Sequence, residues 1–215
     1  MFNRHAFSRF FKVNSDIFLR TLCLIAVTTY FTSAGSAQGE LTLAANTLLM
    51  QFFVLFSYVM DGFAYAGEAL GGKYFGAKSQ AQFKNVARHL FLWGTMLSLL
   101  YTLAYALGGN LLLRLLTNEA SVIAFAEGYL PYVCALPLLS FAAFLFDGLF
   151  IGTTSTRQML LSMATAAALY FLILHLAPMS NATLWTAFLC YLACRGLVQA
   201  VQFRQIKQKV ARGAK

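Results

Sequence analysis

The chain has 215 residues, of which 60% are hydrophobic and only 11% charged, and its formal net charge at pH 7 is +9. A water-soluble domain carries roughly 25% charged residues, so this chain has too little polar surface to face water on all sides. The composition therefore excludes an ordinary soluble domain and indicates that lipid solvates much of the chain.

Six stretches of the sequence are apolar and long enough to cross the hydrocarbon core of a bilayer, which takes about 20 residues. We expect the spans at residues 17–34, 41–69, 89–107, 122–151, 158–176 and 183–203. They predict an all-α fold: a polytopic membrane protein in which residues 1–215 form a single bundle of six transmembrane helices.

The segments beside the first three spans set their expected boundaries. Residues 14–16 (Asn-Ser-Asp) are a candidate N-cap cluster for the first span. The second span is longer than the core requires and should tilt or project. A loop with basic and amide side chains follows at 71–88, with an amphipathic helix inside it as an alternative. Residues 108–110 (Gly-Gly-Asn) should end the third span, with an interfacial turn at 111–116.

Two prolines interrupt the predicted fourth span. Each of Pro131 and Pro137 removes one backbone N–H donor, and each is expected to kink the helix. Neighbouring helices can pair with the freed carbonyl groups, so such kinks are tolerated in membranes. The two prolines are therefore hinge candidates for alternating access, and the alternative is a static bend that fits the bundle.

The basic residues sort to one side of the membrane under this topology. With the N-terminus inside, the cytoplasmic side receives fifteen of the sixteen Lys and Arg residues, and the opposite side receives only Arg114. The positive-inside rule then predicts a multi-pass protein of a bacterial inner membrane with both termini in the cytoplasm. The positive charge faces anionic lipid, so no nucleic-acid partner is needed to explain it.

An ionisable side chain costs roughly 2.5–3.5 kcal/mol at the centre of a transmembrane helix, and five such residues in the predicted spans are the site candidates. They are Arg20, Asp61, Glu68, Asp147 and Arg195. Because lipid cannot solvate them, we expect these side chains to point into the bundle or into a wet cavity.

The second span carries a polar stripe. At about 100° per residue, its members fall within roughly 60° of one another on a helical projection. They are Asn46, Met50, Ser57, Asp61 and Glu68. One interpretation is a surface that lines an ion or substrate path, where a carboxylate can exchange protons. A second is helix packing, with the carboxylates paired to Arg20 and Arg195 as a structural latch and kept ionised. A third is simple exposure at the membrane interface.

The residue types that carry most enzyme chemistry are scattered. The three histidines lie far apart in the sequence, and no HExxH, GxSxG or phosphate-binding loop occurs. The four cysteines lie in apolar runs without metal-ligand spacing, and we expect them to be buried small hydrophobic residues. They are Cys23, Cys134, Cys190 and Cys194. The sequence therefore predicts neither an enzyme nor a metal centre.

Three segments carry a family resemblance. Residues 43–49 read LAANTLL, residues 61–78 read DGFAYAGEALGGKYFGAK and residues 146–159 read FDGLFIGTTSTRQM. In this order they resemble a helix entry, the GxALGA exit into a basic loop and the GxxxGxxxTRxM turn of MATE (multidrug and toxic compound extrusion) transporters. Asp147 in front of the first glycine of that turn, and Arg20 in the first span, are similar to the DinF-like branch of the family.

The resemblance implies half of a transporter. MATE proteins have two six-helix lobes and export organic, often cationic, compounds in exchange for protons or sodium, and this chain resembles the second lobe only. The resemblance implies that an ion or substrate path is lined by Asp61, Glu68 and Asp147. It implies no bound cofactor. Residues 139–141 (Leu-Ser-Phe) stand where the sodium-coupled branch has an acidic residue, so protons are the expected driving ion and sodium is disfavoured.

The half size implies a partner, because one lobe cannot close a central path between two. The expected partners are the lipid bilayer, small organic substrates, and either the missing N-terminal lobe or a second copy of the chain. One alternative is a lipid or lipid-linked oligosaccharide flippase of the same superfamily, which would line its cavity with several arginines where this sequence offers Arg195. Another is a non-transporting membrane assembly subunit.

Overall fold

Residues 4–213, as described by a computed structural model, form seven α-helices and no strand; side chains are described for residues 11–208. The helices are α1 (Arg4–Ser36), α2 (Glu40–Gly76), α3 (Gln80–Leu116), α4 (Ala120–Glu127), α5 (Leu130–Gly152), α6 (Thr156–Leu176) and α7 (Asn181–Gly213). Apart from α4, which has 8 residues, each contains a segment long and apolar enough to cross a membrane. The predicted all-α bundle of six transmembrane helices is confirmed.

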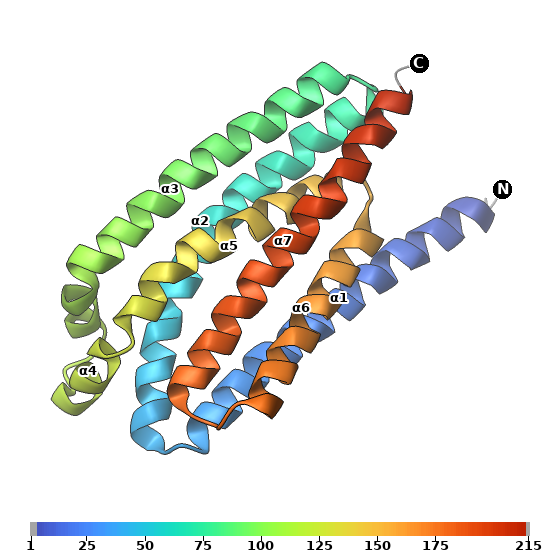
Figure 1. The fold of residues 1–215 in the computed structure, drawn as a ribbon. Coiled ribbons are helices and arrows are strands. Elements are labelled where there is room, and N and C mark those ends of the chain that lie inside the picture. The colour runs from blue at the N-terminus through green and yellow to red at the C-terminus, as the bar shows by residue number, and fades with distance from the viewer. Residues whose placement is uncertain (1–3, 214–215) are drawn as a thin grey trace.

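The long helices lie side by side, and the chain reverses direction from each one to the next (Figure 1). The first and last described residues lie at the same end of the bundle, together with the α2–α3 and α5–α6 turns. Exposed basic side chains such as Lys73, Lys84 and Arg88 belong to this end, whereas Arg114 lies in the last turn of α3 at the other. The fold therefore has the two-sided charge distribution that the sequence predicts.

Two predicted boundaries around α1 and α2 are wrong. Residues 14–16 lie inside α1, so they are no N-cap. The predicted loop at 71–88 is helical except for the short α2–α3 turn. Gly71 is buried against α5, and a Cβ at Gly71 would lie 3.0 Å from the Leu149 side chain. This glycine is needed for close helix packing, so it does not mark the end of a helix.

The third and fourth predicted spans also differ from the structure. α3 continues through 108–110 and 111–116, and Gly109 packs against Leu130 of α5. The predicted span at 122–151 is instead two helices, α4 and α5. Pro131 occupies the first turn of α5, where a backbone N–H has no intrahelical partner to lose, so the predicted kink there is wrong. Pro137 does lie inside α5.

Two glycines one helical turn apart let α5 approach α2 closely. α5 lies in the middle of the bundle and contacts α2, α3 and α7. A Cβ added at Gly148 would overlap the carbonyl oxygen of Ala64, and one at Gly152 would overlap that of Glu68. Small residues at this spacing are typical of tightly packed membrane helices. The contact fixes the distance between the charged residues of α2 and α5.

Replacing Gly148 with Ala should destabilise the bundle, because the added Cβ must push α2 and α5 apart; such overpacking costs about 1–3 kcal/mol. Gly62→Ala is the matched control, since a Cβ at Gly62 meets nothing within 4 Å. Thermal unfolding in detergent, followed by labelling of the free cysteines as they become exposed, should give G148A a lower Tm than G62A. Equal Tm values would contradict the close contact between α2 and α5.

Candidate functional site

A cavity of about 370 Å³ lies between α1, α2, α5 and α7, in the half of the bundle nearer to the chain termini. Six of the residues predicted for an ion path or a charge pair line it together: Arg20, Ser57, Asp61, Glu68, Asp147 and Arg195. Aromatic rings from α2, α5 and α7 form part of its wall, with the Phe53 ring centroid 6.2 Å from that of Phe144 and 5.5 Å from that of Phe188. The predicted residues thus form a single charged site with apolar walls.

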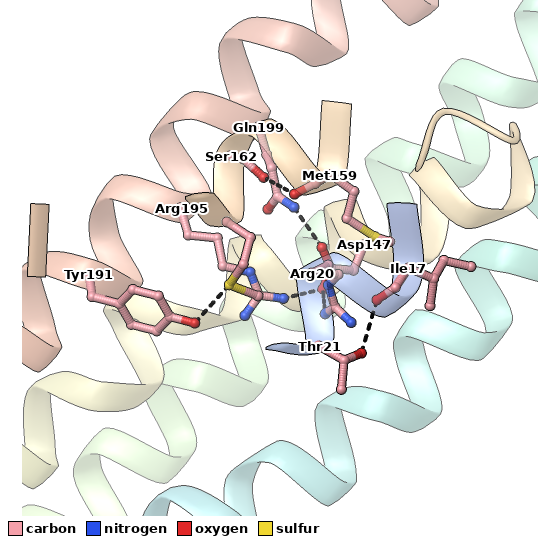
Figure 2. A network of polar contacts seen from close by, with 10 residues as sticks. Ile17, Arg20, Thr21, Asp147, Met159, Ser162, Tyr191, Arg195 and Gln199 are labelled. Atoms are coloured by element: carbon pink, nitrogen blue, oxygen red, sulfur yellow. Dashed lines mark hydrogen bonds and ion pairs between the residues drawn. The ribbon is translucent and has the colours of Figure 1, made fainter. Parts of the chain in front are cut away.

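Asp147 is the centre of a buried charge cluster (Figure 2). Arg20 of α1 and Arg195 of α7 each donate an Nη2–H to the same carboxylate oxygen, Oδ2. Gln199 of α7 donates from Nε2 to the other oxygen, Oδ1, at 2.6 Å. Asp147 is 6% exposed and Arg195 is 3% exposed. One carboxylate therefore ties α1 and α7 to α5.

The partner of the two arginines differs from the predicted latch. The sequence pairs Arg20 and Arg195 with the carboxylates of the second span, whereas both ion pairs go to Asp147 of α5. Arg20 and Arg195 approach Asp147 from α1 and α7. A helical projection of the second span cannot show where these two helices pack. The predicted latch to the second span is therefore wrong: the two arginines are paired, but with Asp147.

Asp61 and Glu68 are the two carboxylates of the cavity that remain without an ion pair among the described side chains. Both are half-buried, and both lie on the face of α2 that lines the cavity. Ser57, one turn before Asp61, donates its hydroxyl to the Val54 carbonyl oxygen at 2.8 Å. The two carboxylates are therefore available to a proton or to a bound cation.

Asn46 and Met50, the other members of the predicted stripe, do not line the cavity. Asn46 is buried and exchanges two hydrogen bonds with Asn181, at 2.7 and 3.1 Å, and accepts a third from Trp185 Nε1 at 2.9 Å. Met50 packs against the apolar core. The stripe therefore divides into a part that packs α2 against the start of α7 and a part that faces the cavity.

Sequence reasoning missed two polar contacts near the site. Gln199 lies one helical turn after Arg195, and this spacing is the one signal that places it beside Asp147. Asp16, expected as an N-cap residue, is buried; it accepts a hydrogen bond from Thr156 at 3.1 Å and forms an ion pair with Arg157, 3.7 Å between Oδ1 and Nη1. This contact joins α1 to the first turn of α6.

The cysteines also differ from the prediction. All four are free, as expected, but they are half-buried rather than buried. Helices that face lipid need not cover their apolar side chains with protein, so an apolar run in a span does not guarantee burial in the bundle.

The fold and the cavity together define a multi-pass helical membrane protein with ionisable groups gathered in its interior, an arrangement typical of transport proteins. The comparison with known families gives the class: the MatE family model matches residues 17–177. The chain belongs to the MatE family.

Several known proteins are similar in sequence to most of this chain. It is 36% identical over 203 residues to the DNA damage-inducible protein F of Escherichia coli (strain K12), a match that covers 94% of this chain and 44% of that protein. It is 25% identical over 196 residues to Protein DETOXIFICATION 42 of Arabidopsis thaliana, covering 89% and 38% of the two chains. The corresponding values for Protein DETOXIFICATION 43 of the same plant are 24% over 193 residues, 89% and 37%. The chain spans less than half the length of these relatives.

Replacing Asp147 with Asn should destabilise the folded protein, because the buried Arg195 and the half-buried Arg20 then lose their counter-charge; breaking a buried ion pair costs roughly 3–5 kcal/mol. Asp61→Asn is the comparison variant, since Asp61 forms no ion pair among the described side chains. The amount of folded protein in the membrane and its Tm in detergent should fall for D147N and stay near wild type for D61N. A D147N variant as stable as D61N would contradict the structural role of Asp147.

Proposed function

We propose that this chain is one six-helix half, the C-terminal one, of a MATE-type efflux antiporter that exchanges organic, often cationic, compounds for protons. The cavity between α1, α2, α5 and α7 forms its part of the path. The observation that carries the proposal is the presence of two carboxylates, Asp61 and Glu68, that line this cavity without an ion pair among the described side chains.

The charge balance of the cavity supports an exchange mechanism. Three carboxylates and two guanidinium groups line it, so its formal charge is −1 when all five are ionised. One proton or one organic monocation brings this sum to zero. Since a second positive charge would then meet a neutral site, proton and cation binding oppose each other. Opposed binding at one site that opens alternately to the two sides of a membrane is sufficient for antiport.

The length of the chain supports the need for a second lobe. The relatives it matches are more than twice as long as the matched segment, and a path between two lobes needs both walls. The N-terminal lobe, from the same or a separate polypeptide, or a second copy of this chain would supply the other wall. Pro137, inside α5 about three turns before Asp147, is the hinge candidate for the movement between the two open states.

The location and the driving ion are part of the same proposal. The single basic end of the bundle supports a bacterial inner membrane with both chain termini in the cytoplasm. Protons are favoured over sodium because residues 139–141, which stand where the sodium-coupled branch has an acid, offer only Ser140 as a polar side chain. Its hydroxyl donates to the Leu136 carbonyl oxygen at 2.7 Å, so it adds no negative charge.

A lipid flippase of the same superfamily is the second candidate. It is favoured by one observation: two arginines, Arg20 as well as Arg195, line the cavity, where the sequence suggests one.

The test uses a chimera in which this chain replaces the segment of the E. coli DNA damage-inducible protein F that it matches. Everted vesicles that contain the chimera should accumulate ethidium when a pH gradient is imposed with the acidic side inside the vesicle. Asp61→Asn and Glu68→Gln should each lower this rate by roughly ten-fold or more, because each removes a charge that the cation or proton binds, at a cost of about 1.4 kcal/mol per factor of ten.

The matched control is Glu40→Gln, which removes a carboxylate from the exposed first turn of the same helix. It should transport at the wild-type rate, and all variants should reach the same abundance in the membrane. Full ethidium transport by both D61N and E68Q would refute the proposed role of the two α2 carboxylates.

A further inference from the structure

The charges of the cavity are separated into two groups. The first, called here the arginine pole, consists of Arg20, Arg195 and Asp147 and has a formal charge of +1. The second, the carboxylate pole, consists of Asp61 and Glu68 on α2 and has a formal charge of −2. The two poles face the same cavity from different helices, since the arginines come from α1 and α7.

The arginine pole has more hydrogen-bond donors than acceptors. Each guanidinium group offers five N–H donors, and both groups share one oxygen of a single carboxylate, whose other oxygen accepts from Gln199. The Nε atoms of Arg20 and Arg195 are buried and have no hydrogen-bond partner among the described residues. The pole also has a net positive charge, so it favours a further acceptor, and an oxyanion is the acceptor that guanidinium binds best.

Arg20 is the member of the pole that a ligand can reach. Its side chain is 19% exposed, compared with 4% for Arg195 and 8% for Asp147, and it lines the cavity. A carboxylate, phosphate or sulfonate group in the cavity would therefore meet Arg20 first, while the less exposed Arg195 remains paired with Asp147.

We propose that the cavity binds zwitterionic amphiphiles, with an oxyanion group on Arg20 and an ammonium group on Asp61 and Glu68. A simple cation lowers the charge of the carboxylate pole from −2 to −1 and leaves the +1 of the arginine pole unbalanced, whereas a simple anion neutralises the arginine pole and leaves the carboxylate pole at −2. A ligand with both charges pairs with both poles, and its apolar body lies against the rings of Phe53, Phe144 and Phe188. A cavity of about 370 Å³ is within the range of drug-sized ligands.

This inference rests on the proposed function, since it names the substrate class of the same site. A zwitterion adds no net charge to the cavity, so its exchange with protons depends on competition for the two α2 carboxylates and not on the summed charge. The ammonium group of the ligand still competes with a proton for Asp61 and Glu68. The oxyanion group adds affinity at Arg20, which is not a binding site for the exchanged proton.

The test compares two dyes that differ in one charge. One is a rhodamine with a free carboxylate beside its cationic ring system, and the other is the ethyl ester of the same dye, a simple cation. Binding to the purified full chain in dodecyl maltoside, which carries no charge, is measured by fluorescence anisotropy. The zwitterion should bind about ten-fold more tightly than the ester, the smallest gain expected from one charge-assisted hydrogen bond. Equal affinity, or tighter binding of the ester, would overturn the proposal.

Variants of Arg20 assign the preference to the arginine pole. Arg20→Gln leaves one guanidinium group for one carboxylate, so the preference for the zwitterion over the ester should fall below about two-fold. Arg20→Lys keeps the charge and should keep the preference. Arg88→Gln, which removes an exposed basic residue of α3 outside the cavity, should also keep it. A full preference in R20Q would overturn the assignment, and the wild-type comparison of the two dyes stands even where a variant fails to fold.

A zwitterion in a membrane has two sources, a dissolved amphiphile and a phospholipid headgroup, and a competition arm separates them. Displacement of the zwitterionic dye by short-chain phosphatidylethanolamine supports the proposal with a lipid headgroup as ligand. Retention of the dye supports it with a dissolved amphiphile. Because this assay needs no transport, loss of efflux in the chimera with the dye preference intact would refute the proposed function alone. Intact efflux with equal binding of the two dyes would refute this inference alone.

Discussion

The carboxylate of Asp147 is the constraint on which the rest of the site depends. It is the one counter-charge within ion-pair distance of both Arg20 and Arg195 in the described part of the chain, and these residues come from α1, α5 and α7. A buried charge without a partner is far more costly than a buried pair, so the three helices must keep these groups together whenever lipid surrounds the bundle. The cluster therefore determines where α1 and α7 lie relative to α5.

The same cluster decides which carboxylates remain for function. Asp147 is occupied by two arginines and Gln199, whereas Asp61 and Glu68 on α2 have no ion pair among the described side chains. Gly148 and Gly152 hold α2 close to α5, so these two carboxylates share a cavity with the cluster without joining it. The site thus combines a charge cluster that ties three helices together with a second carboxylate group for which we propose ligand exchange, both within one bundle.

Much of the fold follows from the sequence, because apolar length and the position of Lys and Arg depend on each residue and its near neighbours. The helix boundaries at 71–88 and 108–110 could not be predicted in the same way, because a glycine can either end a helix or allow a close contact between two helices. Gly71 and Gly109 do the second. The partner of the arginines could not be predicted either: Asp147 is 127 residues from Arg20 and 48 from Arg195. Asn46 packs against Asn181, 135 residues away, so its separation from the cavity depends on the tertiary fold.

A pair of double-mutant cycles tests the central claim most directly. One cycle combines Arg20→Gln with Asp147→Asn and the other combines Arg20→Gln with Asp61→Asn, with the free energy of unfolding measured in bicelles. Residues in one charge network couple by about 0.5–3 kcal/mol, and independent ones stay within about 0.5 kcal/mol of additivity. The account predicts a coupling free energy of about 0.5–3 kcal/mol between Arg20 and Asp147. Between Arg20 and Asp61 it predicts effects that add to within about 0.5 kcal/mol. The reverse result would mean that the α2 carboxylate, and not Asp147, is the counter-charge of Arg20.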